Sequence, residues 1–145
     1  MDRLSQSLCG VTSPLWAWRN IAMLTTLTKS DLIAFEERVK QAFLAHEIHA
    51  PVHLSGGNED QLIGLFEEIR SQDWVFSTWR SHYHVLLKGM PAEELFQAIL
   101  DGRSMFISSK EHKIISSSIV GGILPIACGV ALGAKHKGLD ERVWC

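Results

Sequence analysis

The chain has 145 residues, of which 46% are hydrophobic and 21% are charged. This length suits one domain with a hydrophobic core, and the composition is that of a globular protein rather than a disordered or fibrous one. The net charge is −2, so no global positive field indicates a nucleic-acid partner.

The cysteines and the N-terminal residues bear on the compartment. The chain has three cysteines, far apart in sequence: Cys9, Cys128 and Cys145. This pattern fits neither a disulfide framework nor a zinc site and favours a reducing compartment, which we expect to be the cytoplasm. Residues 1–29 contain Arg3 and Arg19 but only one acid, so a transit peptide, and hence the mitochondrial matrix, is the alternative. We expect residues 1–29 to form an arm and 30–145 to form the domain.

The first predicted helix covers residues 28–48, "TKSDLIAFEERVKQAFLAHEI". Ser30 is its expected N-cap, with Asp31 in the first turn. Glu36 and Lys40, four residues apart, are expected to pair on the outer face. The residues expected to face the core recur at helical spacing: Leu32, Phe35, Val39 and Phe43.

A second helix is predicted after the turn at Gly56-Gly57, with Asn58 as its cap. The side chains expected to point inward are Leu62, Leu65, Phe66 and Ile69. The short apolar stretch "DWVFST" predicts a strand, and "WRSHYHVLLKG" predicts a short helix after it. "MPAEELFQAILDGRS" predicts another helix, with Pro91 in its first turn and Gly102 past its end.

The last part of the chain begins with the polar, serine-rich stretch "RSMFISSKEHKIISSS", which predicts a loop, and closes with "ERVWC", which predicts the start of a strand. Residues 114–134, which begin within the serine-rich stretch, form an uncharged run of 21 residues. A membrane span needs about 20 such residues, and two lysines follow the run, so a single-pass membrane protein is one interpretation. Ser116–Ser118, Gly121-Gly122 and Pro125 argue against one continuous spanning helix.

The alternative interpretation of this run is a soluble, buried helix with a ligand at its N-terminal end. Serines and paired glycines before a helix expose backbone N–H groups to which a ligand can come close. Pro125 then lies in the first turn of a helix that ends near Lys137. Its small residues would allow another subunit to pack closely against it, and we favour this interpretation.

"FSTWRSHYHVLLKGM", followed about 35 residues later by "SSSIVGGILPIACGVALGAKHKG", resembles the alpha subunit of thiamine-diphosphate-dependent 2-oxo acid dehydrogenases. These are the decarboxylating first components of the pyruvate, branched-chain and acetoin dehydrogenase complexes. The likeness runs from about Leu32 to Cys145 and includes "AFEERV", "HLSGGNEDQLIGL" and "RSM". It implies the N-terminal part of an α/β thiamine-diphosphate-binding fold, mostly helical here, with few short strands.

The resemblance also implies residues that bind the cofactor. Trp79 and Arg80 match the pair that contacts the diphosphate, and a guanidinium with an indole N–H suits phosphate oxygens. On chemistry alone, an arginine in an aromatic loop is more often part of a surface ion pair. Ser118 and Val120 fall where the family's backbone meets the aminopyrimidine ring, and the bulk of Val120 would help to hold the cofactor bent.

His53 and His82 match histidines that line the active site in many family members, and we take them as catalytic candidates. For each, the alternative is an ordinary loop histidine with a hydrogen-bond partner. His82 and His84 also form an H-x-H pair, but no third ligand lies at a suitable spacing, so we predict no metal site.

The chain departs from the family at two places. Phe106 replaces a histidine of the family's loop, and no Gly-Asp-Gly turn supplies ligands for the Mg²⁺ that accompanies thiamine diphosphate. We therefore expect a fragment, or a truncated product, that is inactive alone. The complete enzyme would oxidatively decarboxylate a 2-oxo acid and pass the acyl group to lipoyl. Its implied partners are a beta subunit, a second alpha subunit and a lipoyl-bearing acyltransferase. The rival hypothesis is a non-catalytic interaction or regulatory relative.

Overall fold

The computed structural model describes residues 27–145, so the predicted arm and transit peptide lie almost wholly outside the described residues. This part has five helices, α1 (Lys29–Leu44), α2 (Glu59–Phe66), α3 (His82–Leu87), α4 (Ala92–Leu100) and α5 (Ile123–His136). Its strands are β1 (Trp74–Ser77), β2 (Ser108–Ser109), β3 (Ile114–Ser116) and β4 (Val143–Trp144). Helices dominate and the strands are short, which confirms the predicted α/β class.

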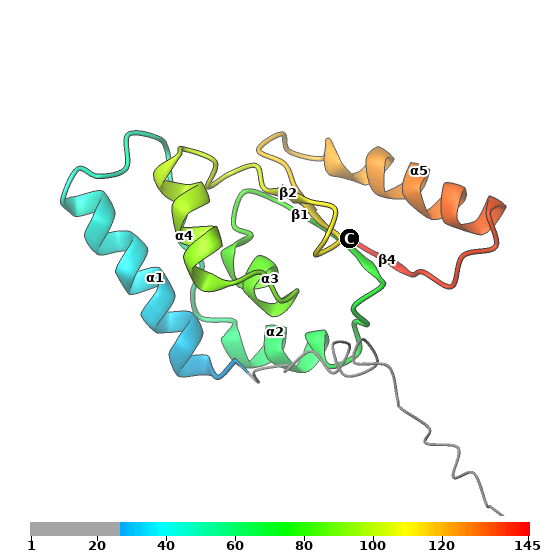
Figure 1. The fold of residues 1–145 in the computed structure, drawn as a ribbon, viewed down its shortest axis with the longest axis horizontal. Helices are drawn as coiled ribbons and strands as arrows, with labels where there is room; N and C mark the ends of the chain where they lie inside the picture. Colours follow the sequence, from blue (N-terminus) through cyan, green and yellow to red (C-terminus); the bar gives the residue numbers. More distant parts are fainter. Residues whose placement is uncertain (1–26) are drawn as a thin grey trace, which may run out of the picture.

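The four strands form one sheet in the order β2-β3-β1-β4. β1 lies at the centre, parallel to both β3 and β4, while β2 pairs antiparallel with β3. Successive side chains of a strand point to opposite faces of its sheet. Val75 accordingly enters the core on the side of α1–α4, and Phe76 enters a smaller core beneath α5. The sheet therefore separates the α1–α4 layer from α5, which lies alone on the other side (Figure 1).

The main core lies between the sheet and α1–α4. Leu32, Val39, Leu95, Ile99 and Ile114 are fully buried in it. Leu32 and Val39 come from α1, Leu95 and Ile99 from α4 and Ile114 from β3, so residues distant in sequence share one apolar interior. The strand predicted within 73–78 is confirmed as β1, and the helices predicted within 79–89 and 90–104 are confirmed as α3 and α4.

The polar stretch 103–118 is not a loop throughout, as the sequence predicted. It contains β2 and β3, which pair Ser108 with Ile115 and Ser109 with Ile114. Ile107 and Ile114 are buried in the main core, so two isolated apolar positions anchor an otherwise polar hairpin to the sheet. Serine-rich composition hides strands of two or three residues, because so few side chains carry the pattern.

Two side chains expected to point inward are exposed. In the last turn of α1 the buried residue is Ala42, and 46% of the surface of Phe43 is exposed. In α2 the buried and half-buried positions include Glu59, Leu62 and Phe66, which follow helical spacing and leave Leu65 outside that stripe. The predictions for Phe43 and Leu65 were therefore wrong.

The helix α1 is capped by Thr28 and not by Ser30 as predicted. The Thr28 hydroxyl accepts from the backbone N–H of Asp31 at 3.3 Å, and the Asp31 carboxylate accepts from the backbone N–H of Thr28 at 2.8 Å. This reciprocal pair is a capping box. The predicted boundary was thus two residues too late.

Replacing Thr28 by alanine is expected to lower the free energy of unfolding by about 1 kcal/mol, because the backbone N–H of Asp31 loses its side-chain acceptor and the Asp31 carboxylate loses the hydroxyl donor. Urea denaturation followed by circular dichroism measures this change. Ser30→Ala is the matched control, because Ser30 lies exposed inside the first turn, and it should change stability by less than about 0.5 kcal/mol. Equal effects of the two variants would contradict the assignment of Thr28 as the cap.

The uncharged run 114–134 is not one helix. It contains β3, a turn and most of α5, which has 14 residues. Across residues 27–145, none of the helices has both the length and the apolar character that crossing a membrane requires. The start of α5 near Pro125 and its end near Lys137 agree with the second interpretation of this run.

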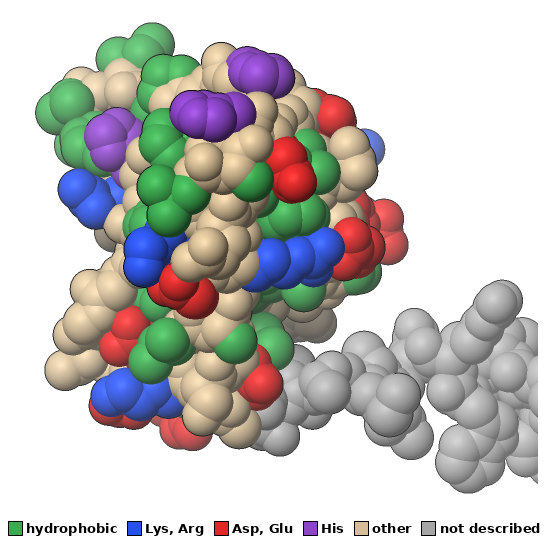
Figure 2. Space-filling model, turned by 90° about the vertical axis from the view of Figure 1, so that its left-hand side faces the viewer, with side chains coloured by type: hydrophobic (Ala, Val, Ile, Leu, Met, Phe, Trp, Pro, Cys, Tyr) green, Lys and Arg blue, Asp and Glu red, His purple; other side chains and the backbone are tan. Residues whose placement is uncertain are grey.

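Charged side chains of both signs are interspersed on the face shown in Figure 2. On α1, Arg38 pairs with Glu93 of α4 through two hydrogen bonds of 2.8 and 2.9 Å, and Lys40 pairs with Glu37. This mixing of charges agrees with the small net charge of the chain.

Candidate functional site

Two loops meet at one edge of the sheet, where β1 and β3 end. The strands are parallel and in register up to Ser77 and Ser116, and the backbone N–H of Ser117 donates to the Ser77 carbonyl at 3.1 Å. The segments that follow β1 and β3 therefore leave the sheet at the same edge. Trp79 and Arg80 follow β1, and residues 118–120 follow β3, so the predicted cofactor residues of both loops lie at this edge. In open α/β sheets, ligands bind outside the carboxyl ends of the strands.

A third segment, residues 53–55, lies against the loop that follows β1. Nη1 of Arg80 donates to the Leu54 carbonyl at 2.7 Å, and the Ser55 hydroxyl donates to the Arg80 carbonyl at 3.2 Å. The rings of His53 and Trp79 meet edge to face, with centroids 6.3 Å apart. The structure thus brings His53, Trp79 and Arg80 together, although α2 lies between His53 and the other two in the chain.

The chemistry of this edge suits a phosphorylated ligand. The Arg80 side chain is exposed, and one of its five N–H groups is occupied by the Leu54 carbonyl. The remaining N–H groups have the planar fork geometry that matches phosphate oxygens, and the indole of half-buried Trp79 carries one further donor. The donor set therefore fits the diphosphate of thiamine diphosphate.

The loop after β3 is a tight turn that leads into α5. The backbone N–H of Ile119 donates to the Ser117 hydroxyl at 3.1 Å, and that of Gly122 donates to the Ile119 carbonyl at 3.1 Å. Gly121 has φ of +74°, a conformation that other residues rarely adopt. Ser118 is exposed, and Val120 is 79% exposed, so both side chains are available at the surface.

His82 lies behind this edge and not on its surface. The side chain is fully buried, with Nδ1 at 3.0 Å from Oε1 of Glu36 and Nε2 at 2.9 Å from the Ser104 hydroxyl. Of the two histidines selected from the sequence, His53 is exposed beside Trp79 and His82 belongs to the interior.

Glu36 is a buried residue beside this edge that the sequence placed wrongly. It does not pair with Lys40 on the outer face, because its carboxylate is 5% exposed and accepts from the backbone N–H of Ser55 at 3.1 Å. Lys40 pairs with Glu37 instead. The signal was its position: Glu36 lies four residues after Leu32 and belongs to the stripe that faces the core.

Among residues 27–145 no group of three or more His, Cys, Asp or Glu side chains is arranged to hold a metal ion. His82 and His84 point to different surroundings: His84 packs edge to face on Phe66 with centroids 5.9 Å apart, and burial lowers its pKa. The described residues therefore do not fit the Mg²⁺ that accompanies a bound diphosphate.

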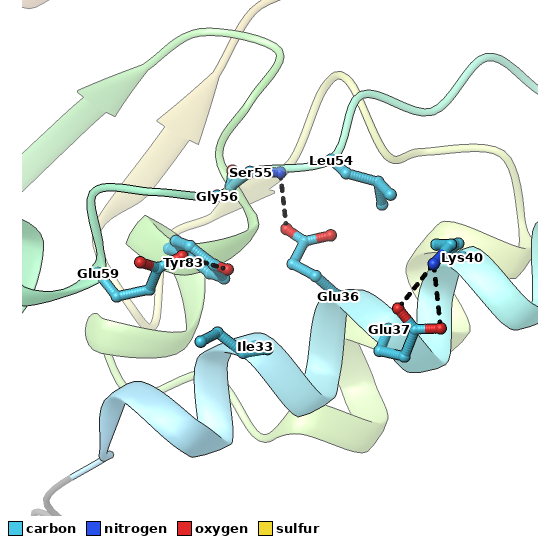
Figure 3. A pocket seen from close by; sticks show the side chains of 9 residues that line it. All are labelled: Ile33, Glu36, Glu37, Lys40, Leu54, Ser55, Gly56, Glu59 and Tyr83. Atoms are coloured by element: carbon cyan, nitrogen blue, oxygen red, sulfur yellow. Dashed lines mark hydrogen bonds and ion pairs between the residues drawn. The ribbon is translucent and has the colours of Figure 1, made fainter.

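A shallow pocket of about 220 Å³ lies between α1 and the segment 54–59 (Figure 3). Its wall contains Glu36, Glu59 and Tyr83, and the Tyr83 hydroxyl donates to Glu59 at 3.1 Å. Burial, the hydrogen bond to Glu59 and nearby acids together raise the pKa of Tyr83. The pocket shares Leu54 and Ser55 with the edge described above but does not include Arg80.

The sequence matches the family model described as "Dehydrogenase E1 component" over residues 28–145. The alpha subunit of acetoin:2,6-dichlorophenolindophenol oxidoreductase from Cupriavidus necator is 31% identical over 130 residues, which cover 82% of this chain and 39% of that protein. The chloroplastic pyruvate dehydrogenase E1 component subunit alpha-3 of Arabidopsis thaliana is 32% identical over 114 residues, covering 72% and 27%. The mitochondrial somatic-form pyruvate dehydrogenase E1 alpha subunit of Sus scrofa is 27% identical over 137 residues, covering 81% and 35%.

The chain thus spans between 27% and 39% of the length of these relatives. The match to the family model begins at Thr28, the N-cap of α1, and covers all nine described elements. It includes the loops after β1 and β3 and the segment 53–55, so the resemblance read from the sequence is confirmed. The chain belongs to the dehydrogenase E1 component family, and its likeness is to the alpha subunits of that family.

Proposed function

We propose that this chain forms part of the alpha subunit of a thiamine-diphosphate-dependent 2-oxo acid dehydrogenase, which oxidatively decarboxylates a 2-oxo acid and transfers the acyl group to lipoyl. The observation that carries the proposal is the position of Arg80. Its guanidinium is held on the Leu54 carbonyl at the edge where β1 and β3 end, beside the loop that follows β3.

Each segment of this edge has a role in the proposal. Arg80 and the indole of Trp79 would bind the diphosphate, and His53 would face the substrate side. The backbone at Ser118 would meet the aminopyrimidine, and Val120 would support its bent shape. Bound thiamine diphosphate supplies the carbanion-stabilising chemistry of the reaction, while the protein orients the reactants and excludes water.

The ligands for Mg²⁺, which residues 27–145 do not provide, would come from the rest of the assembly. The proposed partners are a beta subunit, a second alpha subunit and a lipoyl-bearing acyltransferase. α5 offers a surface for subunit contacts, because Leu124, Ile126 and Leu132 are each about half exposed. A Cβ atom placed on Gly129 or Gly133 would meet no neighbouring atom within 4 Å. The surface of α5 is therefore open at both glycines, and another backbone can approach it closely.

The proposal predicts that Arg80 dominates diphosphate binding. Titration of the ¹⁵N-labelled chain with thiamine diphosphate and Mg²⁺, followed by NMR, detects even weak binding, and shifts are expected at Leu54, Trp79 and Ser118. Arg80→Ala should weaken binding by about 10-fold to 100-fold, because charge-assisted hydrogen bonds contribute about 1.5–3 kcal/mol. The affinity of Arg80→Lys should lie between those of the wild type and Arg80→Ala, since lysine keeps the charge but loses the planar pair of donors.

Arg38→Ala is the matched control, because Arg38 is an exposed arginine whose guanidinium is engaged with Glu93 of α4. It should leave the affinity unchanged. Equal affinity of the wild-type chain and Arg80→Ala would overturn the assigned role of Arg80. Absence of any shift at the three reporter residues, with Mg²⁺ present, would favour the non-catalytic interaction relative.

A further inference from the structure

We infer that the buried pair formed by His82 and Glu36 is a positioning device that sets the orientation of Arg80 through the segment 54–55. The inference rests on the proposed function, in which Arg80 binds the diphosphate. It assigns roles to two side chains that do not reach the surface of the site, so they are positioning residues and not catalytic ones.

The first step is the environment of His82. A carboxylate can only accept hydrogen bonds, so Nδ1 of His82 must donate to Glu36 when Glu36 is ionised. In the neutral ring, Nε2 then accepts a hydrogen bond from the Ser104 hydroxyl, 2.9 Å away. These two contacts fix both the tautomer and the plane of the ring, and all three side chains are buried.

The second step leads from Glu36 to the chain that carries the ligand site. Oε1 of Glu36 accepts from the backbone N–H of Ser55 at 3.1 Å, and Figure 3 shows this carboxylate reaching from α1 to Ser55. A buried carboxylate is costly unless its lone pairs have donors. His82 and Ser55 are its donors among the described residues, so each depends on the other to keep Glu36 in place.

The third step is the double contact between this segment and Arg80. The carbonyl of Leu54 accepts from the guanidinium at 2.7 Å, and the Ser55 hydroxyl donates to the Arg80 carbonyl at 3.2 Å. One contact therefore orients the side chain of Arg80 and the other fixes its backbone. These two contacts can fix Arg80 only if residues 54–55 are themselves fixed. The hydrogen bond from the Ser55 N–H to Glu36 fixes that segment.

The chain of contacts closes on itself, because Arg80 and His82 are separated by one residue at the start of α3. An arginine side chain carries about 2 kcal/mol of rotamer entropy, so fixing it before the ligand arrives removes part of the cost of binding. The same contacts connect the site to α1 through Glu36 and to the loop after α4 through Ser104.

Two substitutions of His82 separate its two contacts. The amide nitrogen of asparagine takes the place of Nδ1, so His82→Asn keeps a donor toward Glu36 and loses the contact with Ser104. Glutamine reaches the position of Nε2, so His82→Gln keeps the contact with Ser104 and loses the donor to Glu36. Both variants replace the same buried ring by an amide, and they therefore carry similar structural damage.

The readout is the order of the Arg80 side chain in the ligand-free chain, measured as the ¹H–¹⁵N heteronuclear NOE of its Nε–H group. We expect His82→Gln to lower the NOE of the Arg80 Nε–H group toward that of a mobile side chain. His82→Asn should retain most of the wild-type NOE. Affinity for inorganic pyrophosphate should fall about tenfold in His82→Gln and less in His82→Asn, as is typical when support behind a ligand-binding group is lost.

Ser55→Ala provides a second route if the His82 variants do not fold. It removes only the hydrogen bond to the Arg80 carbonyl and should therefore lower the backbone ¹H–¹⁵N NOE of Arg80. Glu93→Gln is the control, because it disturbs the bidentate pair with Arg38 and should leave Arg80 unchanged.

Equal Arg80 order in the wild type, His82→Gln and Ser55→Ala would overturn the inference. Equal loss of order in His82→Asn and His82→Gln would also overturn it, because damage to packing would then explain both. If Arg80 loses order as expected but pyrophosphate does not bind the wild type, the positioning device stands and the proposed function fails.

Discussion

Asp73→Ala is expected to lower the free energy of unfolding by about 3 kcal/mol, because it removes a fully buried carboxylate on which several hydrogen-bond donors converge. Asp73 has no exposed surface. Its carboxylate accepts from the Arg70 guanidinium at 2.8 Å, from the backbone N–H of Arg142 at 2.9 Å and from the indole of Trp144 at 3.3 Å. One side chain thus joins the start of β1 to β4, and its removal leaves several donors without an acceptor. Thermal and urea denaturation measure the loss.

Asp140→Ala is the matched control for this variant. Asp140 pairs with the same guanidinium at 2.8 Å, but its side chain is 86% exposed, so water can replace it. An exposed pair contributes about 0–1 kcal/mol. A loss in Asp140→Ala as large as that in Asp73→Ala would show that Arg70 acts as a surface charge and that burial of Asp73 is not the source of stability.

The same carboxylate predicts a dependence of stability on pH. Burial alone would raise the pKa of Asp73, but the hydrogen bonds from Arg70, Arg142 and Trp144 outweigh it and hold the pKa well below its usual range. A pKa that is lower in the folded state gives stability at neutral pH that is lost as the pH falls below the unfolded value of about 3.9. We expect the free energy of unfolding to fall more steeply between about pH 5 and pH 2 in the wild type than in Asp73→Asn.

Regular elements could be predicted where a pattern extends over several residues. The helix predicted from "MPAEELFQAILDGRS" is α4, the strand predicted from "DWVFST" is β1, and the helix begun near Pro125 is α5. Each carries either a continuous apolar run or a terminus signal such as Pro91. The hairpin β2-β3 carries neither, and it is stabilised by pairing with β1 and by burial of Ile107 and Ile114 in the main core.

The buried acids show why the contacts behind the candidate site could not be predicted. Glu36 and Glu59 both occupy core-facing positions of their helices, α1 and α2, and Glu36 was predicted to pair with Lys40 on the outer face. Each is buried because its donors come from segments far along the chain or from a turn: His82 and Ser55 for Glu36, Tyr83 and Gly57 for Glu59. Glutamate in the apolar stripe of a helix is therefore a sequence signal for a buried partner, although it does not identify that partner.

The residues of the edge itself could be selected because they match a family motif, and not because their chemistry alone distinguishes them. An exposed arginine beside a tryptophan is ordinary on a protein surface. Its position became specific only when the parallel pairing of β1 with β3 brought the loop at Arg80 beside that at Ser118, and when residues 53–55 closed the third side. This pairing is set by tertiary contacts, which local patterns do not encode.

Phe76→Ala is expected to release α5 from the sheet while leaving the other layer folded. Phe76 is 3% exposed and forms the small core beneath α5 with Ile123 and Ala127. Removing a buried phenylalanine costs about 3–5 kcal/mol. Because this core shares few side chains with the main one, the loss should fall on the local opening of α5 and β4. Hydrogen exchange followed by mass spectrometry should show faster exchange in α5, with α1 and α4 close to the wild type.

Val75→Ala is the control on the opposite face of the same strand. Val75 is equally buried but packs in the core of α1–α4, where deletion of two methyl groups should cost about 1.6 kcal/mol. Its effect should appear in α1 and α4 and should be smaller. Uniform loss of protection in Phe76→Ala would contradict the separation into two cores. Selective release of α5 would mean that the helix beside the proposed cofactor edge is attached mainly by one aromatic side chain, so that a subunit packed on its exposed face would stabilise it further.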